Sequence, residues 1–186
     1  MAASPHNIHI EPWRPDPEHL AGDIAMLGIV LHAVVHNGSS VSFILPFSHD
    51  DADSFWRDKV LPAVEAETCC VLVARHEARI IGTVQLDFAT PPNQPHRAEV
   101  KKLLVHPDFR RAGVARALML AIEDQARVAG RTLLTLDTAS DPAEQLYSSL
   151  GYVRVGVIPR YSRRPDSPEL EGTTMMYKEL PAEAQS

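Results

Sequence analysis

The sequence has little cysteine and no excess of positive charge. Its two cysteines, Cys69 and Cys70, are adjacent, and a disulfide between neighbouring strand residues would be strained because they point to opposite faces. We therefore expect two reduced core thiols and a reducing, cytoplasmic location. The formal net charge of −6 argues against non-specific nucleic-acid binding, which needs a cationic surface.

Long apolar runs and a leader-like start are also missing. The first residues, MAASPHNIHIEPW, lack the basic start and apolar run of a signal peptide. The longest apolar stretch, Ile24 to Val35, is interrupted by His32 and is shorter than the ~20 residues of a membrane span. We find no internal repeat. With 186 residues, 45% of them hydrophobic, we expect a single domain over 1–186 and no membrane partner.

The hydrophobic pattern predicts alternating strands and helices. Strands are expected at 8–13, 69–74, 79–88, 97–105, 133–137, 152–158 and 173–180. Helices are expected at about 16–35, 50–64, 113–129 and 142–150, and a polar loop at 161–172. This order predicts an α/β (mixed α+β) fold. Its central sheet is mixed and largely antiparallel, with about seven strands and helices on both faces.

The segment EVKKLLVHPDFRRAGVARALM, at 99–119, is the strongest local signal. A strand ends at Val105, a turn of small residues follows, and an amphipathic helix begins. The free N–H groups of a helix's first turn form an anion site with the helix dipole, and nearby arginines add charge. A pyrophosphate is the natural occupant. Spacing alone leaves an ordinary strand–turn–helix open, because one glycine is a weaker fingerprint than several.

At this point the sequence resembles a known family. RRAGVA at 110–115 matches the R/Q-x-x-G-x-G/A signature of the GNAT N-acetyltransferase superfamily, and LYSSLGYVRVG at 146–156 resembles its Tyr-bearing helix followed by L-G-[FY]. HNGSSVSF, RAEVKKLLV and LLTLDT also resemble the tabtoxin-resistance subgroup, which acetylates a β-lactam amino-acid toxin. The resemblance implies acetyl-CoA as cosubstrate, no metal, and a small amine, such as an amino-acid-like toxin or antibiotic, as acceptor.

The resemblance also implies which residues bind acetyl-CoA. Pantetheine contacts fall on the backbone of Leu103, Leu104 and Val105. Pyrophosphate contacts fall mainly on backbone amides of Arg110, Arg111, Ala112, Gly113, Val114, Ala115 and Arg116. Tyr147 corresponds to a tyrosine near the CoA sulfur. Its ordinary pKa of about 10 leaves it protonated and able to donate to the departing thiolate, although a packing role remains the alternative.

Two carboxylates, Glu99 and Asp137, are candidate bases. Each either accepts the amine proton, through water, or holds the ammonium. The alternatives are a salt bridge from Glu99 to Arg97 or Lys101, and a turn role for Asp137. The loops 36–43 and 161–172 are the expected substrate side. His32 and His36 have a metal-compatible spacing, but with no third ligand apparent we expect solvated or packed histidines.

Three functions therefore remain in view. The first is N-acetylation of a small amine by direct attack in a ternary complex. The second is acetylation of a peptide or protein N-terminus or lysine, which would need an open groove. The third is a non-catalytic GNAT module that binds CoA. A homodimer through the C-terminal strands is a further expectation from the resemblance.

Overall fold

Seven strands form one sheet in a computed structural model of the chain, which describes residues 8–181. The strands are β1 (Ile8–Pro12), β2 (Cys69–His76), β3 (Arg79–Asp87), β4 (Arg97–Val105), β5 (Leu133–Thr138), β6 (Val153–Arg163) and β7 (Leu170–Glu179). They lie in the order β1-β2-β3-β4-β5-β7-β6. Only the β4–β5 pair is parallel among these neighbours, which confirms the largely antiparallel mixed sheet.

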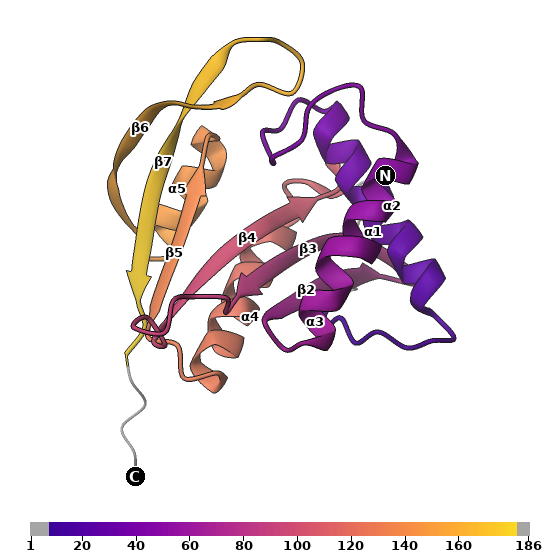
Figure 1. Cartoon of the computed structure of the whole chain (residues 1–186), viewed down its shortest axis with the longest axis horizontal. Coiled ribbons are helices and arrows are strands. Elements are labelled where there is room, and N and C mark those ends of the chain that lie inside the picture. The colour runs from indigo at the N-terminus through magenta and orange to yellow at the C-terminus, as the bar shows by residue number, and fades with distance from the viewer. Residues whose placement is uncertain (1–7, 182–186) are drawn as a thin grey trace.

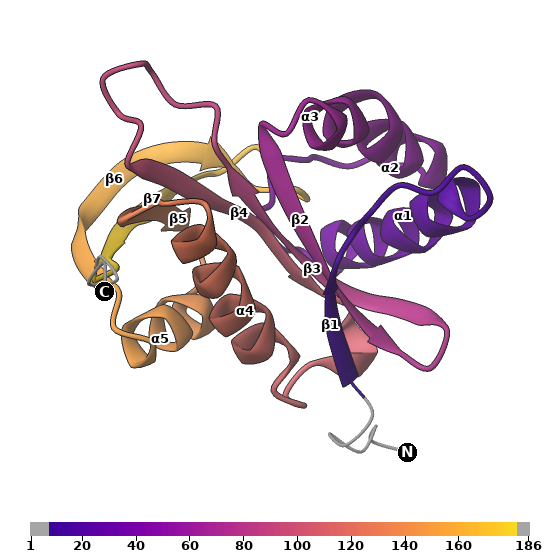
Figure 2. The same ribbon diagram turned by 90° about the horizontal axis from the view of Figure 1, so that it is seen from below.

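Helices cover both faces of this sheet (Figures 1 and 2). One face carries α1 (Leu20–His36), α2 (His49–Phe55), the π-helical turn η2 (Trp56–Val60) and α3 (Leu61–Glu65). The other carries α4 (Val114–Val128) and α5 (Asp141–Ser149), and a short turn η3 (Pro107–Phe109) precedes α4. The helix expected at 50–64 is thus present with a π-helical turn inside it. Within residues 8–181 no helix combines the length and apolar character that a membrane crossing requires.

Alternation along β2 divides the core into two parts. Val71 and Val73 pack on the α1 side, whereas Leu72 and Ala74 pack on the α4 side. Cys69 is buried and Cys70 half-buried, and both are free thiols, as predicted.

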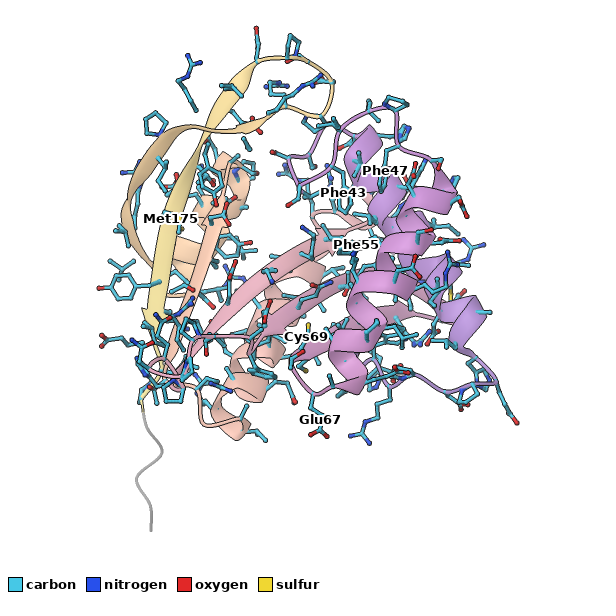
Figure 3. All side chains as sticks on the ribbon, viewed as in Figure 1. Phe43, Phe47, Phe55, Glu67, Cys69 and Met175 are labelled. Carbon is cyan, nitrogen blue, oxygen red and sulfur yellow. The ribbon has the colours of Figure 1, made fainter. Side chains whose placement is uncertain are left out.

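An aromatic cluster fixes the segment between α1 and α2. The ring of Phe43 lies 4.7 Å from that of Phe47 and 5.1 Å from that of Phe55, measured between centroids (Figure 3). Aromatic pairs at such spacings add to the stabilisation from burial. The cluster therefore holds the segment after α1 against α2, close to the open side of β4 described below.

The expected polar loop at 161–172 is much shorter in the structure. β6 continues to Arg163 and β7 begins at Leu170, so only residues 164–169 connect the two strands. Ser162 pairs with Glu171 in the extended ribbon. The prediction was wrong here because this ribbon has few buried positions, and a strand exposed on both faces lacks the apolar alternation that marks a strand in sequence.

Candidate active site

The parallel strands β4 and β5 pair only at their beginnings. Residues 97–99 of β4 face residues 133–135 of β5, and the strands diverge beyond Glu99. β5 stays with β7 as far as Thr138, whereas β4 continues beside β3 to Val105 (Figure 1). Within residues 8–181 the later part of β4 has no strand on its β5 side. Its backbone groups there are available to a ligand.

A β-bulge at Lys102 bends β4 where the two strands diverge. Gln85 of β3 faces Lys101 and Thr83 faces Leu104, so β4 carries one extra residue between these pairs. Lys102 has a φ of 50°, in the left-handed region. Bulges re-aim side chains and end pairing next to active sites. The bulge was not predicted, because VKKLLV is typical of one continuous strand.

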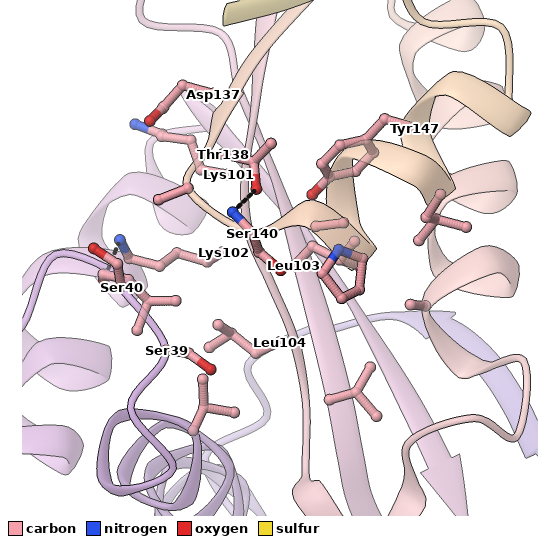
Figure 4. Close-up of a pocket in the computed structure, with 18 of the residues that line it drawn as sticks. Ser39, Ser40, Lys101, Lys102, Leu103, Leu104, Asp137, Thr138, Ser140 and Tyr147 are labelled. Atoms are coloured by element: carbon pink, nitrogen blue, oxygen red, sulfur yellow. Dashed lines mark hydrogen bonds between the residues drawn. The ribbon is translucent and has the colours of Figure 1, made fainter. Parts of the chain in front are cut away.

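A pocket of about 1180 Å³ occupies the opening between β4 and β5 (Figure 4). All but one of the residues predicted for the site line it, namely Glu99, Leu103, Leu104, Val105, Arg110, Arg111, Gly113, Val114, Ala115, Arg116, Asp137 and Tyr147. The exception, Ala112, packs against the hydrophobic core. The structure therefore brings residues from three separate parts of the chain to one pocket.

The turn before α4 presents a row of backbone amides to this pocket. Arg111 and Gly113 have φ values of 63° and 81°, and α4 begins at Val114 directly after Gly113. A Cβ at Gly113 would meet no heavy atom within 4 Å, so this position is open. The first-turn amides of α4 have no acceptor within the helix. Together with the helix dipole they favour an anion at this end of α4.

Two arginine side chains beside this turn are held by neutral partners. Arg110 donates hydrogen bonds to Asn37 Oδ1 and, at 3.4 Å, to Ser39 Oγ, both after α1. Arg116 donates to the Ser149 hydroxyl of α5 at 2.6 Å. Because these partners are amide and hydroxyl oxygens, the positive charges are not neutralised by them. Both guanidinium groups can therefore attract a phosphate.

Tyr147 enters the pocket from α5 and is 6% exposed (Figure 4). Its ring packs against that of Tyr152, with 5.8 Å between centroids. Burial, with a smaller effect of the Asp137 carboxylate, raises the pKa of Tyr147 to about 12. The phenol therefore stays protonated across the neutral range and can act as a hydrogen-bond donor at the pocket wall.

Glu99 lies half-buried on β4, at the last residue paired with β5. Neither of the ion pairs considered for it forms. Lys101 binds Asp87 of β3, and Arg97 donates to the neutral side chains of Gln94 and Thr135. The Glu99 carboxylate therefore faces the pocket without either of these cations as its partner.

Asp137 occupies the opposite border of the opening, on β5. It is exposed and accepts a hydrogen bond from the Thr173 hydroxyl of β7 at 2.8 Å. Glu171, also on β7, is a third carboxylate of the pocket, and its Oε1 is buried without a hydrogen-bond partner among the described residues. The β5–β7 side of the pocket is therefore acidic, and sequence analysis missed Glu171 because it placed this residue in a loop.

The two predicted substrate segments meet at the pocket. The Leu45 amide donates to the Pro165 carbonyl at 2.9 Å, and the hydroxyls of Ser40 and Ser162 lie 3.4 Å apart. Ser39, Ser40 and Ser42 line the pocket from one segment, and Tyr161, Ser162, Arg164 and Glu171 line it from the other. These contacts bridge the opening between β4 and the β6–β7 ribbon.

Lys102 is a pocket residue that sequence analysis did not single out. Its ammonium donates to the Val41 carbonyl and the Ser42 hydroxyl, each at 3.0 Å. Burial, aided by the neighbouring Lys101, lowers the pKa of Lys102 to about 8. Polar and apolar residues alternate along β4 from Arg97 to Lys101, and the second consecutive lysine, Lys102, breaks this alternation. Such local conflicts are expected at functional sites. This pair of lysines was the sequence feature from which Lys102 could have been predicted as a site residue.

Three histidines stack away from these pocket residues. The His32 ring lies 3.9 Å from that of His36 and 3.7 Å from that of His49, between centroids. Burial, followed by the charges of His49 and His36, lowers the pKa of His32. Residues 8–181 contain no group of three or more His, Cys, Asp or Glu side chains arranged to hold a metal ion. His32 is therefore half-buried within the stack, whereas His36 is stacked on it but exposed.

Comparison with known proteins adds a family match. Residues 34–152 match the model described as the Acetyltransferase (GNAT) family, and this range includes every residue predicted to bind acetyl-CoA or to act in catalysis. N-acetyltransferase 8 of Rattus norvegicus is 27% identical over 154 residues, which cover 72% of this chain and 69% of that protein. The IAA acetyltransferase of Azospirillum brasilense is 32% identical over 96 residues, which cover 50% of this chain and 61% of that protein.

A solved structure is similar over nearly the whole chain. It is an acetyltransferase of Salmonella typhimurium with its cofactor acetyl-CoA. It matches with a TM-score of 0.71 at 19% identity and covers 97% of each chain. At this identity the likeness concerns the fold.

Proposed function

The chain belongs to the GNAT acetyltransferase family, and we propose that it transfers an acetyl group from acetyl-CoA to the amine of a small molecule. One observation carries the proposal. A single pocket is lined by the anion-binding turn before α4, by the free edge of β4, by Tyr147 and by carboxylates of β4 and β5. An acyl carrier with a diphosphate and an amine with a positive charge need these groups in one place.

The residues of the pocket fit acetyl-CoA, which supplies the activated acetyl group when bound. In this proposal the amides around Gly113 bind the diphosphate, and Arg110 and Arg116 add charge beside it. The backbone of residues 103–105, on the free edge of β4, pairs with the amides of the pantetheine arm. The bulge at Lys102 then directs the thioester end toward the opening.

The chemistry needs a proton donor for sulfur and an acceptor for the amine proton. Tyr147 holds its proton and donates a hydrogen bond to the departing sulfur. Glu99 and Asp137 hold the ammonium and accept its proton directly or through water. The cysteines do not line the pocket, and burial raises the pKa of Cys69 to about 12, so a Cys nucleophile is disfavoured. Direct attack within a ternary complex is therefore the proposed route.

A small acceptor is favoured over a peptide. The Leu45–Pro165 and Ser40–Ser162 contacts join the segment after α1 to the β6–β7 ribbon. Such a connection leaves less room for an extended peptide than for a small amine. The segments resembling the tabtoxin-resistance subgroup favour an amino-acid-like toxin or antibiotic as acceptor. If the acceptor is instead a peptide or protein, these two contacts must break when it binds.

We also propose a cytoplasmic homodimer. The free thiols of Cys69 and Cys70 suit a reducing compartment. On β6, Val153, Val155 and Val157 are 50%, 69% and 50% exposed, which gives the ribbon an apolar surface that a second copy would cover. Light scattering of the eluted protein tests this part of the proposal, and a monomer at all concentrations would remove it.

A thiol-release screen tests the proposed function. The purified chain is incubated with acetyl-CoA and, separately, amino acids, β-lactam amino acids, aminoglycosides, polyamines and short peptides. Thiol release with a small amine supports the proposal. Release with peptides alone favours the alternative activity. Calorimetry in parallel reports CoA affinity, and tight binding with no turnover in any arm would favour a non-catalytic CoA-binding module.

A further inference from the structure

Lys102 holds a positive charge at the floor of the pocket. Its strand is bulged, and its side chain extends from β4 towards the segment after α1 (Figure 4). The Nζ atom lies 5.5 Å from the ring centroid of Phe43 and 5.8 Å from that of Phe55. These are cation–π distances, so the aromatic cluster shown in Figure 3 also forms one wall around this ammonium.

This ammonium has capacity for one more acceptor. A lysine carries three N–H donors, and Lys102 directs two of them to the neutral oxygens of Val41 and Ser42. Arg110 and Arg116 also have neutral partners, but they lie beside the turn before α4. Of the cations nearer the substrate segments, Lys101 binds Asp87 and Arg164 binds Asp166. Lys102 forms no such ion pair with a carboxylate of the described residues. Its charge is therefore a docking point for an anionic group of a ligand.

The facing side of the pocket has the opposite character. Asp137 of β5 and Glu171 of β7 line it, and the buried Oε1 of Glu171 has no hydrogen-bond partner among the described residues. Glu99, on β4 itself, adds a third carboxylate to the pocket. An unpaired buried acceptor is costly, and a ligand N–H would satisfy it. The substrate part of the pocket thus offers carboxylates for a cation and one ammonium for an anion.

We propose that Lys102 binds the carboxylate of the acceptor while the three carboxylates bind its amine, so that the substrate class is free amino acids and their close analogues. This inference rests on the proposed function and adds to it a specificity residue. An amine without a carboxylate brings no anionic partner to the Lys102 ammonium, whose hydrogen bonds go to two neutral oxygens. The pocket therefore discriminates against simple amines and against amino acids whose carboxyl group is blocked.

The test compares each free L-amino acid with its carboxamide, in which the carboxylate alone is neutralised. Thiol release is measured for the unmodified chain and for Lys102→Met, which keeps a long apolar side chain over Phe43 and Phe55. We expect the unmodified chain to prefer the acid by at least about tenfold in kcat/KM, the size of one hydrogen bond to a charged group. Lys102→Met should lose this preference by lowering turnover of the acid while sparing the amide.

Two controls separate specificity from folding. Lys102→Arg keeps the charge and should retain part of the preference. Lys101→Met removes a neighbouring cation that is already paired, so its effect should be equal for acid and amide. Equal losses on acid and amide in Lys102→Met would show a structural anchor for residues 41–42 and overturn the inference. A preference of the unmodified chain for amides would overturn it as well.

The inference and the proposed function can fail separately. Thiol release with polyamines or aminoglycosides, and with no amino acid, would support acetyl transfer and exclude this role of Lys102. If no amine supports thiol release, the affinities of the amino acids and their amides test the role of Lys102 instead. Calorimetry with L-amino acids and their amides, in the presence of CoA, should show tighter binding of the acids that is lost in Lys102→Met. Binding of neither class, or of both equally, would overturn the inference.

Discussion

Lys178 of β7 donates a hydrogen bond to the carboxylate of Glu123 on α4 at 2.6 Å. Glu123 is 2% exposed, and the same ammonium also donates to the Leu150 carbonyl at the end of α5, at 2.7 Å. Arg127 lies 3.8 Å from the same carboxylate oxygen. The pair therefore ties α4 to the sheet and to the helix that carries Tyr147.

Removal of Lys178 should destabilise the fold strongly. Lys178→Met leaves the Glu123 carboxylate buried with Arg127 as its remaining cation, and breaking a buried pair from one side costs about 3 kcal/mol or more. Urea unfolding measures this loss. The double variant Glu123→Leu/Lys178→Met removes the uncompensated charge, so it should regain much of the stability. A double variant no more stable than Lys178→Met alone would contradict the ion-pair explanation.

Gly113→Ala should lower the affinity for acetyl-CoA and should also lower the free energy of unfolding slightly. The left-handed φ of 81° makes a side chain strained by about 1 kcal/mol. The new Cβ would also project into open pocket space beside the amides that we propose bind the diphosphate. Gly130→Ala is the matched control, because Gly130 has a φ of 66°, open surroundings and a place outside the pocket lining.

Calorimetry and urea unfolding distinguish these two glycine variants. We expect similar losses of stability in both, and a loss of acetyl-CoA affinity in Gly113→Ala alone. Equal affinities for acetyl-CoA in the two variants would remove the turn before α4 from the cosubstrate site.

Elements with one buried face were predictable from the sequence. The strand at 97–105 was predicted to the residue, and α4 differs from its predicted range by one residue at each end. In α4 the apolar residues recur every four positions and Gly130 stops the helix. The ends of β6 and β7 carried no such pattern, because exposed strands in a two-stranded ribbon need no apolar face.

The parts of the site that lie in local sequence motifs were also predictable. The turn before α4 and Tyr147 lie in local motifs, where the chemistry follows from neighbouring residues. The bulge at Lys102 depends on pairing with β3, and the Leu45–Pro165 contact joins residues 120 positions apart. Such features arise from tertiary structure, so the position of Lys102 in the pocket required the fold itself.

Lys102 should make the free energy of unfolding depend on pH above 8. Its pKa is about 8 in the folded chain and near 10.4 in an unfolded one. Between these values the unfolded chain binds more protons, so the contribution of Lys102 to stability rises with pH. The stability of the unmodified chain relative to Lys102→Met should increase by roughly 1–3 kcal/mol from pH 7 to pH 10. Urea unfolding from pH 7 to pH 10 measures this difference in the free energy of unfolding. A difference that stays constant or falls as the pH rises would contradict the lowered pKa of Lys102.

Tyr147→Phe should impair turnover while leaving cosubstrate binding intact. The variant keeps the ring that packs on Tyr152 but removes the hydroxyl that we propose donates to sulfur. We therefore expect kcat to fall about 100-fold, the typical contribution of a positioned proton donor. The affinity for acetyl-CoA, measured by calorimetry, should change by no more than about twofold. Tyr177→Phe is the control, since Tyr177 lies on β7 outside the pocket lining and its variant should keep normal thiol release. Unchanged turnover in Tyr147→Phe would mean that another group stabilises the departing sulfur, and Tyr147 would then be a packing residue of α5.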